Sequence, residues 1–427
     1  MRDQEPAPMD AERRLSTKEA AELLGVKPET VYAYVSRGQL SSRRVSGGRG
    51  STFDAGEVEA LARRNRRDSS GGSGSGSSGG GNPGGELSVR TRLTLIESDR
   101  YFFRGVDAVE LATRHTYEEV AEWLWTGRML PGSTFTAPAA FVSVARRAVE
   151  ALPEHAAPAD LLRVATVAAA TADPLRFDLS EDAVLGTART LIPTLVAALP
   201  PAGHHRRDEG PMAHRLWTRL SVRKDPDEAS LRALDVALAL LVDHDLAAST
   251  LAVRVAASAR AHPYAAVSAG LGVIEGPLHG AASGLAHRLL QDVLEQGDAA
   301  PVIADELRAG RRVPGLGHRL YPGEDPRARA LFSLLERIPR AEPALLAARD
   351  IVETTARHAP LHANVDLALA VLTVSSGMAP TAGETIFAVA RTAGWIAHAL
   401  EEYGERPLRM RPSGLYAGPK PPQPLPE

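Results

Sequence analysis

Apolar residues in the long C-terminal part of the chain recur with the period of an α-helix. Residues 343–359 and 387–403, which read PALLAARDIVETTARHA and FAVARTAGWIAHALEEY, place them at positions i, i+3, i+4 and i+7. Alternation of apolar and polar residues over more than about five positions, the pattern of a half-buried strand, is nearly absent. Proline and glycine interrupt the helical pattern roughly every 30–40 residues and mark the loops. We therefore predict an all-α domain with few strands.

The first part of the chain has the pattern of a helix-turn-helix. Ser16 or Thr17 can cap a short helix that Gly25 ends, and the apolar residues of this helix share one face. A second helix is predicted over residues 29–37, and Gly38 ends it. Two short helices joined by a turn that contains glycine are typical of DNA-binding proteins, in which the second helix enters the major groove.

The residues that follow, SSRRVSGGRGSTFDAGEVEALARR, are similar to the wing and third helix of MerR/excisionase-type DNA-binding domains. Residues 37–67 contain eight arginines and three acidic residues, a charge that suits a phosphate backbone. The pattern of residues 15–67 therefore predicts a small winged helix-turn-helix domain that binds DNA, although such a module can also serve contacts with protein. The candidate DNA-binding residues are Thr30, Tyr32, Tyr34, Arg37, Arg43, Arg44 and Arg49.

A segment of low complexity separates this domain from the rest of the chain. Residues 69–85 read SSGGSGSGSSGGGNPGG, with nine glycines and six serines. Such a segment has too little apolar surface to offset the entropy that it would lose on ordering. We predict a flexible linker over residues 68–86, which spans roughly 20–25 Å, and a second domain over residues 87–420.

The composition of the whole chain narrows the class of protein. Of 427 residues, 44% are hydrophobic and 24% are charged, which is typical of a soluble globular protein. The absence of cysteine excludes disulfides, thiolate metal sites and a cysteine nucleophile. No apolar run reaches the roughly 20 residues that span a bilayer, and the polar N-terminus is unlike a signal peptide. We predict a cytoplasmic protein with no membrane contact. The net charge of −3 is too small to mark the whole chain as a nucleic-acid binder.

Three residues of the predicted helical domain stand in settings that favour chemistry. His279 lies in GPLHG, where flexible backbone at a helix start lets a side chain point into a cleft. His318 lies on the glycine-rich segment VPGLGHRLYPGEDPRA, and Asp366 begins the apolar pattern of VDLALAVL. Taken alone, each has a structural explanation, because an acid at a helix start can simply cap the helix. Their order along the chain is more informative than any one of them.

The order of these motifs resembles the citrate synthase family. GPLHG, VPGLGHRLY with DPRA, NVD and FAVARTAGWIAHALEE follow one another as in that family. The similarity extends to SDRYFFRGVDAVELATRHTYEEVAEWLWTG, to VDHDLAASTLAVRVAAS and to RPSGLYAG, and it covers about residues 86–418. The resemblance implies a large and a small helical lobe. The small lobe, at about residues 281–377, would close over the substrates.

The resemblance also implies a reaction and a role for each of the three residues. The reaction would condense acetyl-CoA or propionyl-CoA with oxaloacetate to give citrate or 2-methylcitrate and CoA. Asp366 would be the base that removes a proton from the acyl group, and His279 would donate to the thioester carbonyl. His318 would polarise the oxo-acid carbonyl and protonate its oxygen. The resemblance implies no cofactor, since the CoA thioester is itself a substrate. We predict no metal, because the histidines lie far apart in the sequence in unlike settings and the mechanism needs none.

Two further groups of residues follow from the same resemblance. The substrate-binding group, a cationic cradle for the dicarboxylate, would consist of His244, Arg327, Arg391 and Arg411. Arg411 would reach across the subunit boundary of a homodimer or larger assembly. The adenine of CoA would lie against the backbone of Val313, Pro314, Gly315, Leu316 and Gly317.

Several residues beside these motifs depart from the family pattern. GPLHG continues with Ala281, Ser283 and Gly284, and His362–Ala363 precede NVD where an aromatic residue and proline are usual. Residues 200–228 also match poorly. These departures leave open the choice between acetyl-CoA and propionyl-CoA.

Two hypotheses for function stay open at this point. The first is an active citrate or 2-methylcitrate synthase that carries a DNA-binding module. The second is a transcriptional regulator whose synthase-like domain senses an oxo-acid or acyl-CoA without turnover. The presence of His279, His318 and Asp366 favours the first, since a pure sensor has no need of the base.

Overall fold

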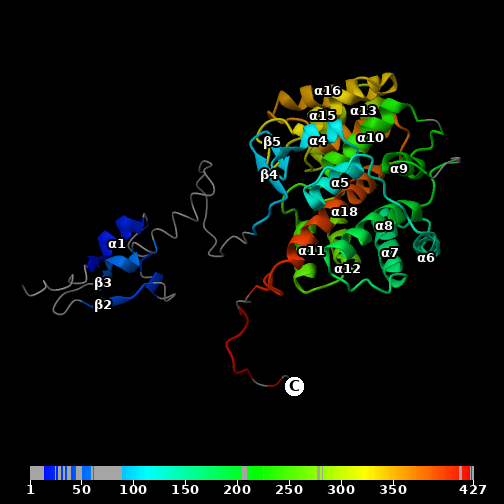
Figure 1. Ribbon diagram of the computed structural model, residues 1–427. Helices are drawn as coiled ribbons and strands as arrows, with labels where there is room; N and C mark the ends of the chain where they lie inside the picture. Colours follow the sequence, from blue (N-terminus) through cyan, green and yellow to red (C-terminus); the bar gives the residue numbers. More distant parts are fainter. Residues whose placement is uncertain are drawn as a thin grey trace, which may run out of the picture. The chain divides into compact units, whose positions relative to one another are not determined.

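The chain divides into two compact units, Met1–Ser88 and Val89–Glu427 (Figure 1). The computed structural model describes residues 14–24, 26, 30–31, 34–35, 40–44, 51–58, 61, 89–203, 209–224, 226–276, 279–280, 282–412, 416–423 and 425. Each unit has a hydrophobic core of its own. The boundaries 15–67, 68–86 and 87–420 stay predictions.

Within its described residues, the first unit consists mainly of a small antiparallel sheet and helix α1. Strands β1 (Arg14–Ser16), β3 (Ser51–Asp54) and β2 (Ser42–Arg44) lie side by side in that order, and α1 (Thr17–Leu24) follows β1. Ser16 caps α1 as predicted, because its hydroxyl accepts from the Glu19 backbone while the Glu19 carboxylate accepts from the Ser16 backbone. The sequence pattern did not predict β1.

The core of the first unit is small, and the sheet and α1 share it. Its buried apolar residues are Leu15, Ala20, Ala21, Val31, Leu40, Phe53, Ala55, Val58 and Leu61. The pairing of β2 with β3 lies where the wing is predicted.

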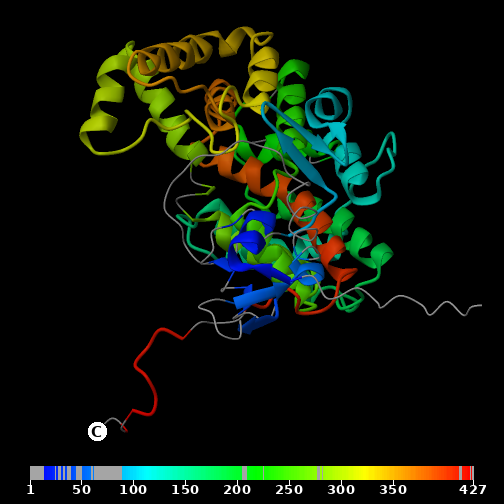
Figure 2. The same cartoon turned by 90° about the vertical axis from the view of Figure 1, so that its left-hand side faces the viewer.

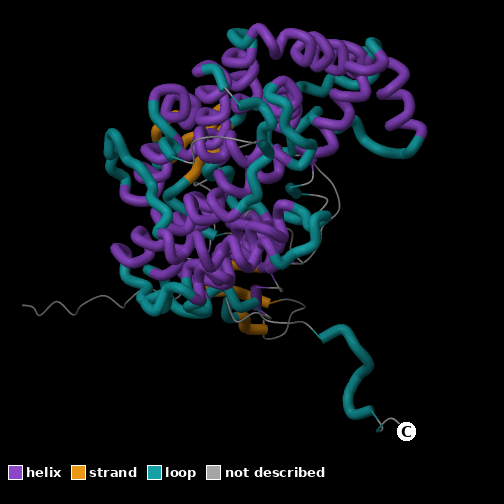
Figure 3. The backbone as a smooth tube through the Cα atoms, turned by 90° about the vertical axis from the view of Figure 1, so that its right-hand side faces the viewer, coloured by secondary structure: helices purple, strands orange, loops and turns teal. Residues whose placement is uncertain are grey.

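Helices make up most of the regular secondary structure of the second unit, as Figure 3 shows, and the predicted fold class is confirmed. One three-stranded antiparallel sheet, which the sequence did not predict, precedes the helices: β4 (Thr94–Glu97), β5 (Arg100–Phe103) and β6 (Val106–Asp107). The helices are α4 (Ala108–Arg114), α5 (Tyr117–Thr126), α6 (Ala139–Glu150), α7 (Pro158–Thr171), α8 (Glu181–Ala198), α9 (Met212–Leu220), α10 (Glu228–Leu241), α11 (Ala248–Ser258), α12 (Pro263–Ile274), α13 (Ala282–Gln296), α14 (Ala299–Arg308), α15 (Pro326–Leu335), η1 (Pro339–Ala341), α16 (Glu342–Ala356), α17 (Val365–Ser375) and α18 (Ala382–Tyr403).

Helix α18 forms the centre of the second unit, since it packs against α5, α8, α10, α11 and α12. Its residues are buried on nearly every side. At Gly394 the helix lies against the end of α10, where an added Cβ would be 2.1 Å from the Val242 carbonyl oxygen. Only glycine allows this approach. The approach matters for function because the chain reaches His244 directly after α10.

Helices α13, α14 and α16 gather at one end of the unit, where Figure 2 shows them in yellow to orange. Helix α17 packs against α13 and α16 and also contacts α18 and α10. It therefore connects this end with the centre. The boundaries 281–377 for a small lobe stay a prediction. Within the described part of the chain, no helix is long and apolar enough to cross a membrane.

Candidate active site

Three segments far apart in the sequence meet around His244. The His244 ring, which follows α10 and is buried, lies with its centroid 5.2 Å from that of His318. Its Nε2 lies 2.8 Å from the hydroxyl of Tyr321. Burial, with Arg327 and Arg391 nearby, holds the pKa of His244 well below its ordinary value. The ring is therefore neutral at pH 7 and can offer one N–H donor.

His318 is also held as a neutral ring. The backbone N–H of Leu320 donates to its Nδ1 over 3.1 Å. On the other side of the ring, Arg327 Nη2 lies 3.3 Å from Nε2. Burial and the charge of Arg327 lower the pKa of His318 to about 4. An N–H donor beside a guanidinium suits the polarisation of a carbonyl group.

A buried ion pair orients Arg327 and connects it with the start of α17. Asp325, which caps α15, accepts from Arg327 Nε and Nη2 over 2.9 and 2.8 Å. The same carboxylate accepts the backbone N–H of Val365 over 3.0 Å. Although burial opposes it, Asp325 raises the pKa of Arg327, which stays charged. The cation on α15 and the first turn of α17 therefore share one carboxylate.

Asp366 lies in that first turn of α17. Asn364 caps the helix by accepting the backbone N–H of Asp366 over 2.9 Å. Burial raises the pKa of Asp366 to about 6, Arg327 opposes this rise, and Asp325 adds to it. No described residue donates a hydrogen bond to its carboxylate. A desolvated carboxyl group with a pKa near 6 is suited to general-base chemistry.

His279 contacts a hydroxyl group on α11. Its Nε2 lies 2.7 Å from Ser249 Oγ, and its ring centroid lies 6.1 Å from that of Phe387. Burial and the charge of Arg391 lower the pKa of His279. The ring is thus a neutral partner at pH 7, with an orientation that Ser249 helps to define.

Arg391, on α18, is a buried cation with spare hydrogen-bonding capacity. Its Nε donates to the Leu241 carbonyl over 2.9 Å, and its guanidinium lies 4.5 Å over the Phe387 ring. Its Nη2 has no hydrogen-bond partner among the described residues. Burial lowers the pKa of Arg391 to about 10, against the influence of Asp243, so it remains charged at pH 7. An anionic ligand could satisfy the free N–H group.

A chain of buried charges, here called the α18 cluster, lies behind this cation. It consists of Asp243, Arg254, His398, Glu401 and Glu402. His398 Nε2 lies 3.2 Å from the Asp243 carboxylate, and Arg254 Nη1 lies 2.8 Å from His398 Nδ1. Burial opposes ionisation of Asp243, but His398 and Arg391 hold its pKa below the ordinary value. The cluster thereby places a negative charge beside both His244 and Arg391.

The predicted CoA segment, residues 313–317, is bonded to the residues before Asp366. The Asn364 backbone N–H donates to the Gly315 carbonyl over 2.9 Å, and the Gly317 N–H donates to the His362 carbonyl over 2.8 Å. Leu316 and Ala363 form an isolated antiparallel bridge. Gly315 has φ +81°, and an added Cβ would lie 2.9 Å from the Leu367 Cβ. This close approach requires glycine.

The remaining predicted residues lie elsewhere or outside the description. Arg411 is exposed, and its backbone N–H bonds the Leu408 carbonyl. In the first unit, Thr30 and Tyr34 are described and Arg43 and Arg44 lie on β2. Tyr32, Arg37 and Arg49 lie outside the described residues.

Sequence reasoning did not select Tyr321, Ser249, Phe387 or Asn364 as site residues. Tyr321 lies in the GHRLY motif and Ser249 in VDHDLAAS, so each belongs to a segment that drew attention for another residue. No local signal marks which of these side chains meet, because the contacts join segments that are 30 and 77 positions apart in the sequence.

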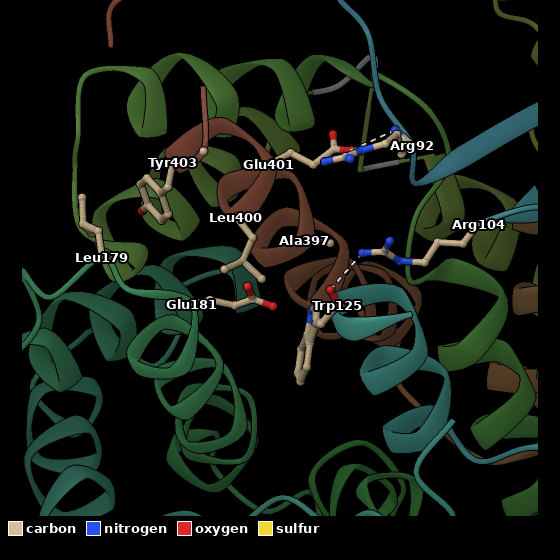
Figure 4. A pocket seen from close by; sticks show the side chains of 10 residues that line it. Arg92, Arg104, Trp125, Leu179, Glu181, Ala397, Leu400, Glu401 and Tyr403 are labelled. Carbon is tan, nitrogen blue, oxygen red and sulfur yellow. Dashed lines mark hydrogen bonds and ion pairs between the residues drawn. The ribbon is translucent and has the colours of Figure 1, made fainter. Parts of the chain in front are cut away.

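A pocket of about 300 Å³ lies apart from these residues, at the C-terminal half of α18 (Figure 4). Arg104 caps α5 there by donating to the carbonyls of Leu124 and Trp125. Arg92 contacts Glu401 at its rim. Its described lining contains none of the predicted site residues. Across the described residues, no group of three His, Asp or Glu side chains is placed to hold a metal.

Comparison with known proteins gives consistent similarities. A model of the family "Citrate synthase, C-terminal domain" matches residues 84–413, and a model of a helix-turn-helix domain matches residues 14–66. The citrate synthase of Haloferax volcanii is 30% identical over 364 residues, which cover 79% of this chain and 95% of that protein. Relatives from Mycobacterium tuberculosis and Mycobacterium bovis are 36% identical over 205 residues, and the chain spans 55% of their length.

Solved structures give the same similarity. The citrate synthase from Pyrobaculum aerophilum matches with a TM-score of 0.66 and 25% identity, over 80% of this chain and 93% of that chain. The citrate synthase from Thermotoga maritima matches with a TM-score of 0.63 and 25% identity, over 80% of this chain and 96% of that one.

Proposed function

The chain belongs to the citrate synthase family, and from that membership we propose that it condenses an acyl-CoA with oxaloacetate to give citrate, or a 2-alkyl citrate, and CoA. One observation carries the proposal. The desolvated carboxyl group of Asp366 has a pKa near 6 and lies in the first turn of α17. Asp325 connects this turn with Arg327, and Arg327 in turn contacts His318. A base and an electrophile for a carbonyl group are thereby held together.

In the proposed reaction Asp366 removes a proton from the carbon next to the thioester carbonyl. The carbon acid is weak, so the developing enolate oxygen needs a hydrogen-bond donor, and His279 supplies it. When the Ser249 hydroxyl donates to His279 Nε2, the ring proton lies on Nδ1 and faces the enolate oxygen. A neutral imidazole suits this role, since burial and Arg391 lower its pKa.

The enolate carbon then attacks the keto carbon of oxaloacetate, and a carbon–carbon bond forms. His318 donates a ring proton to the keto oxygen, which becomes the product hydroxyl. Arg327, whose Nη2 lies 3.3 Å from His318 Nε2, stabilises the negative charge that develops during this transfer. Water finally hydrolyses the thioester of the intermediate, and the free carboxylate and CoA leave.

The carboxylates of oxaloacetate would be bound by Arg391, Arg327 and His244. The Arg391 Nη2, which lacks a partner among the described residues, supports this assignment. Arg411 would complete the cradle from a second copy of the chain, because it is exposed here and bonded only to its own segment among the described residues. We therefore propose a homodimer as the smallest active assembly. Val313, Pro314, Gly315, Leu316 and Gly317 would contact CoA.

The reaction is tested by release of free thiol with oxaloacetate and either acetyl-CoA or propionyl-CoA. Turnover with one or both of these thioesters would support the synthase and would identify the acyl group. Binding of oxaloacetate and acyl-CoA without any thiol release would favour the second candidate, a regulator that senses these ligands. That candidate rests on the helix-turn-helix match at residues 14–66.

We also propose that the first unit binds DNA. The match to a helix-turn-helix domain and the arginines of residues 37–67 support it. Arg43 and Arg44 lie on β2, which pairs with β3 at the predicted wing. Gel-shift experiments with the full chain and with residues 89–427 test the assignment. DNA retention that falls with salt and disappears with the first unit would support it. If residues 89–427 alone released no thiol, the proposal that the second unit catalyses the reaction independently of the first unit would be wrong.

A further inference from the structure

The segment assigned to CoA and the helix that carries the base are joined by three hydrogen bonds. Two are backbone bonds, from Asn364 to Gly315 and from Gly317 to His362, and together they form the antiparallel bridge between Leu316 and Ala363. The third is a side-chain bond, in which Asn364 Nδ2 donates to the Gly317 carbonyl over 2.9 Å. Residues 313–317 and 362–364 therefore form one hydrogen-bonded unit.

Asn364 uses both ends of its amide group in this unit. While Nδ2 donates to the loop, Oδ1 accepts the backbone N–H of Asp366. One planar group thus bonds simultaneously to the glycine loop and to the residue proposed as the base. An ordinary N-cap makes only the second kind of bond. Asp298, the cap of α14, accepts from the Ala300 backbone and is exposed.

The two glycines of this loop make its conformation costly to order, and a side-chain bond helps to offset that cost. Gly315 and Gly317 both have positive φ, and glycine loses more backbone entropy on ordering than other residues. Among the described residues, the side-chain donor to the Gly317 carbonyl is Asn364. Without this side-chain bond, only backbone bonds would hold the loop. The position of the first turn of α17 would then depend less on the position of the loop.

We infer that Asn364 is a positioning residue that couples the acyl-CoA loop to the base, so that a CoA thioester seated on residues 313–317 brings the Asp366 carboxylate into register with its acyl group. This inference rests on the proposed function of the site. It predicts that the bond to Gly317 acts on acyl-CoA and on proton removal, and leaves oxaloacetate binding unchanged. Among the described residues, the hydrogen bonds of His244, Arg327 and Arg391 do not involve the Asn364 side chain.

The decisive variant is Asn364→Ser, with Asn364→Ala and Asp298→Ala beside it. Serine is a good N-cap and keeps an acceptor for the Asp366 N–H, but it is too short to reach the Gly317 carbonyl. Alanine loses both bonds. Asp298→Ala removes a cap with no connection to the loop, and so it measures the cost of capping alone, about 1 kcal/mol.

We expect Asn364→Ser to raise the KM for acyl-CoA about 5–10-fold and to lower kcat by a similar factor, the scale of one lost hydrogen bond. The KM for oxaloacetate and the melting temperature should stay close to those of the parent protein. Asn364→Ala should show the same kinetic losses together with a lower melting temperature. Asp298→Ala should lower the melting temperature and leave both KM values unchanged.

Two results would overturn the inference. If Asn364→Ser left both kcat and the KM for acyl-CoA unchanged, the bond to Gly317 would be dispensable. A purely structural role would be shown if Asn364→Ser raised the KM values for oxaloacetate and acyl-CoA equally and lowered the melting temperature as much as Asn364→Ala does. Calorimetric titration with CoA separates these results from failure of the proposed reaction. If the parent protein binds CoA without turnover, weaker binding by Asn364→Ser still supports the coupling. If the parent does not bind CoA, the loop assignment and the inference both fail.

Discussion

The second unit contains two groups of buried or half-buried charges that differ in how many of their members form ion pairs. The α18 cluster has been defined above; the other, here called the site cluster, consists of Asp325, Arg327, Asp366 and Arg391. In the α18 cluster every member takes part in a hydrogen bond or ion pair with another member, although Glu402 Oε1 has no hydrogen-bond partner among the described residues. In the site cluster, Arg391 has an unpartnered Nη2 and no ion pair among the described residues, and the Asp366 carboxylate lacks a described donor.

The contrast separates charges that stabilise the fold from charges held ready for a ligand. An unsatisfied buried polar group costs about 1–3 kcal/mol, so a fold retains it only when something else compensates. Packing around α18 supplies that compensation, because the helix is buried against several neighbours. Substitutions in the site cluster should therefore affect turnover more than stability, and substitutions in the α18 cluster should do the opposite.

The largest effect is expected for Asp366→Asn. Loss of the general base should lower kcat by about 10²–10⁴-fold.

The same substitution should increase the stability of the fold at neutral pH. The raised pKa of Asp366 means that the folded state favours the protonated form, so its contribution is present below pH 3.8 and is lost as pH rises through about 6. Asparagine removes this penalty, and the free energy of unfolding at pH 7.5 should rise by about 3 kcal/mol. Thiol-release kinetics and urea unfolding measure both changes.

The exposed carboxylate Asp305, paired with Arg308 at the surface, provides the control for this substitution. Asp305→Asn should change neither kcat nor unfolding beyond about 0.5 kcal/mol. If Asp366→Asn lowered the free energy of unfolding by as much as it raised the activation free energy of turnover, the distinction between the two clusters would be lost.

The next effect is expected for Arg254→Met in the α18 cluster. The side chain of Arg254 is 1% exposed, and its removal leaves Glu401 and Glu402 without their buried partner. The free energy of unfolding should fall by about 3–5 kcal/mol, as measured by urea titration. Arg308→Met, at a pair in which the arginine is 74% exposed, should change stability by less than about 1 kcal/mol. Equal results for the two variants would contradict a stabilising role of the cluster.

Arg391→Met makes the same substitution in the site cluster. The variant loses a cation that has one unpartnered nitrogen, so the free energy of unfolding should stay within about 1 kcal/mol of the parent value. The KM for oxaloacetate should rise about 100-fold, the scale of a lost guanidinium–carboxylate contact. Calorimetric titration with oxaloacetate measures the affinity directly. A large loss of stability with intact oxaloacetate binding would assign Arg391 to the structural group.

The smallest effect is the pH dependence of turnover. Asp366 acts as a base only when ionised, so kcat should fall about tenfold per pH unit below a pKa near 6. His318, with a pKa near 4, stays neutral through that range and adds no second step there. A pH profile of kcat between 4.5 and 8 tests this. An acid limb centred far below pH 5 would assign the proton transfer to a group other than Asp366.

Much of the architecture could be predicted from local patterns. The helical period predicts the all-α fold, and Ser16 with Glu19 forms the predicted cap in the first unit. The sheet of β4, β5 and β6 and the strand β1 were not predicted. These strands have two to four residues, which is too short for a periodic pattern to show.

The candidate site could be predicted only in part. The motif order marks His244, His279, His318, Arg327 and Asp366. It does not reveal that Ser249 contacts His279 or that Tyr321 contacts His244, since these bonds join residues from different elements. The proposed role of Arg411, which is exposed in the single chain, requires a second copy of the chain, and the sequence suggests that copy only by resemblance.

The sequence by itself indicated that the long C-terminal part of the chain is helical, where the glycine-rich segment lies and which residues are candidates for chemistry, because these depend on neighbours a few positions away or on short motifs. Only the tertiary structure decided which charges are satisfied. Asp243 and His398 are 155 positions apart, and they meet because α18 approaches the end of α10 at Gly394. The same packing desolvates Asp366 and leaves Arg391 with a free N–H group. Burial and hydrogen-bond partners are properties of the packed fold, so no local pattern specifies them.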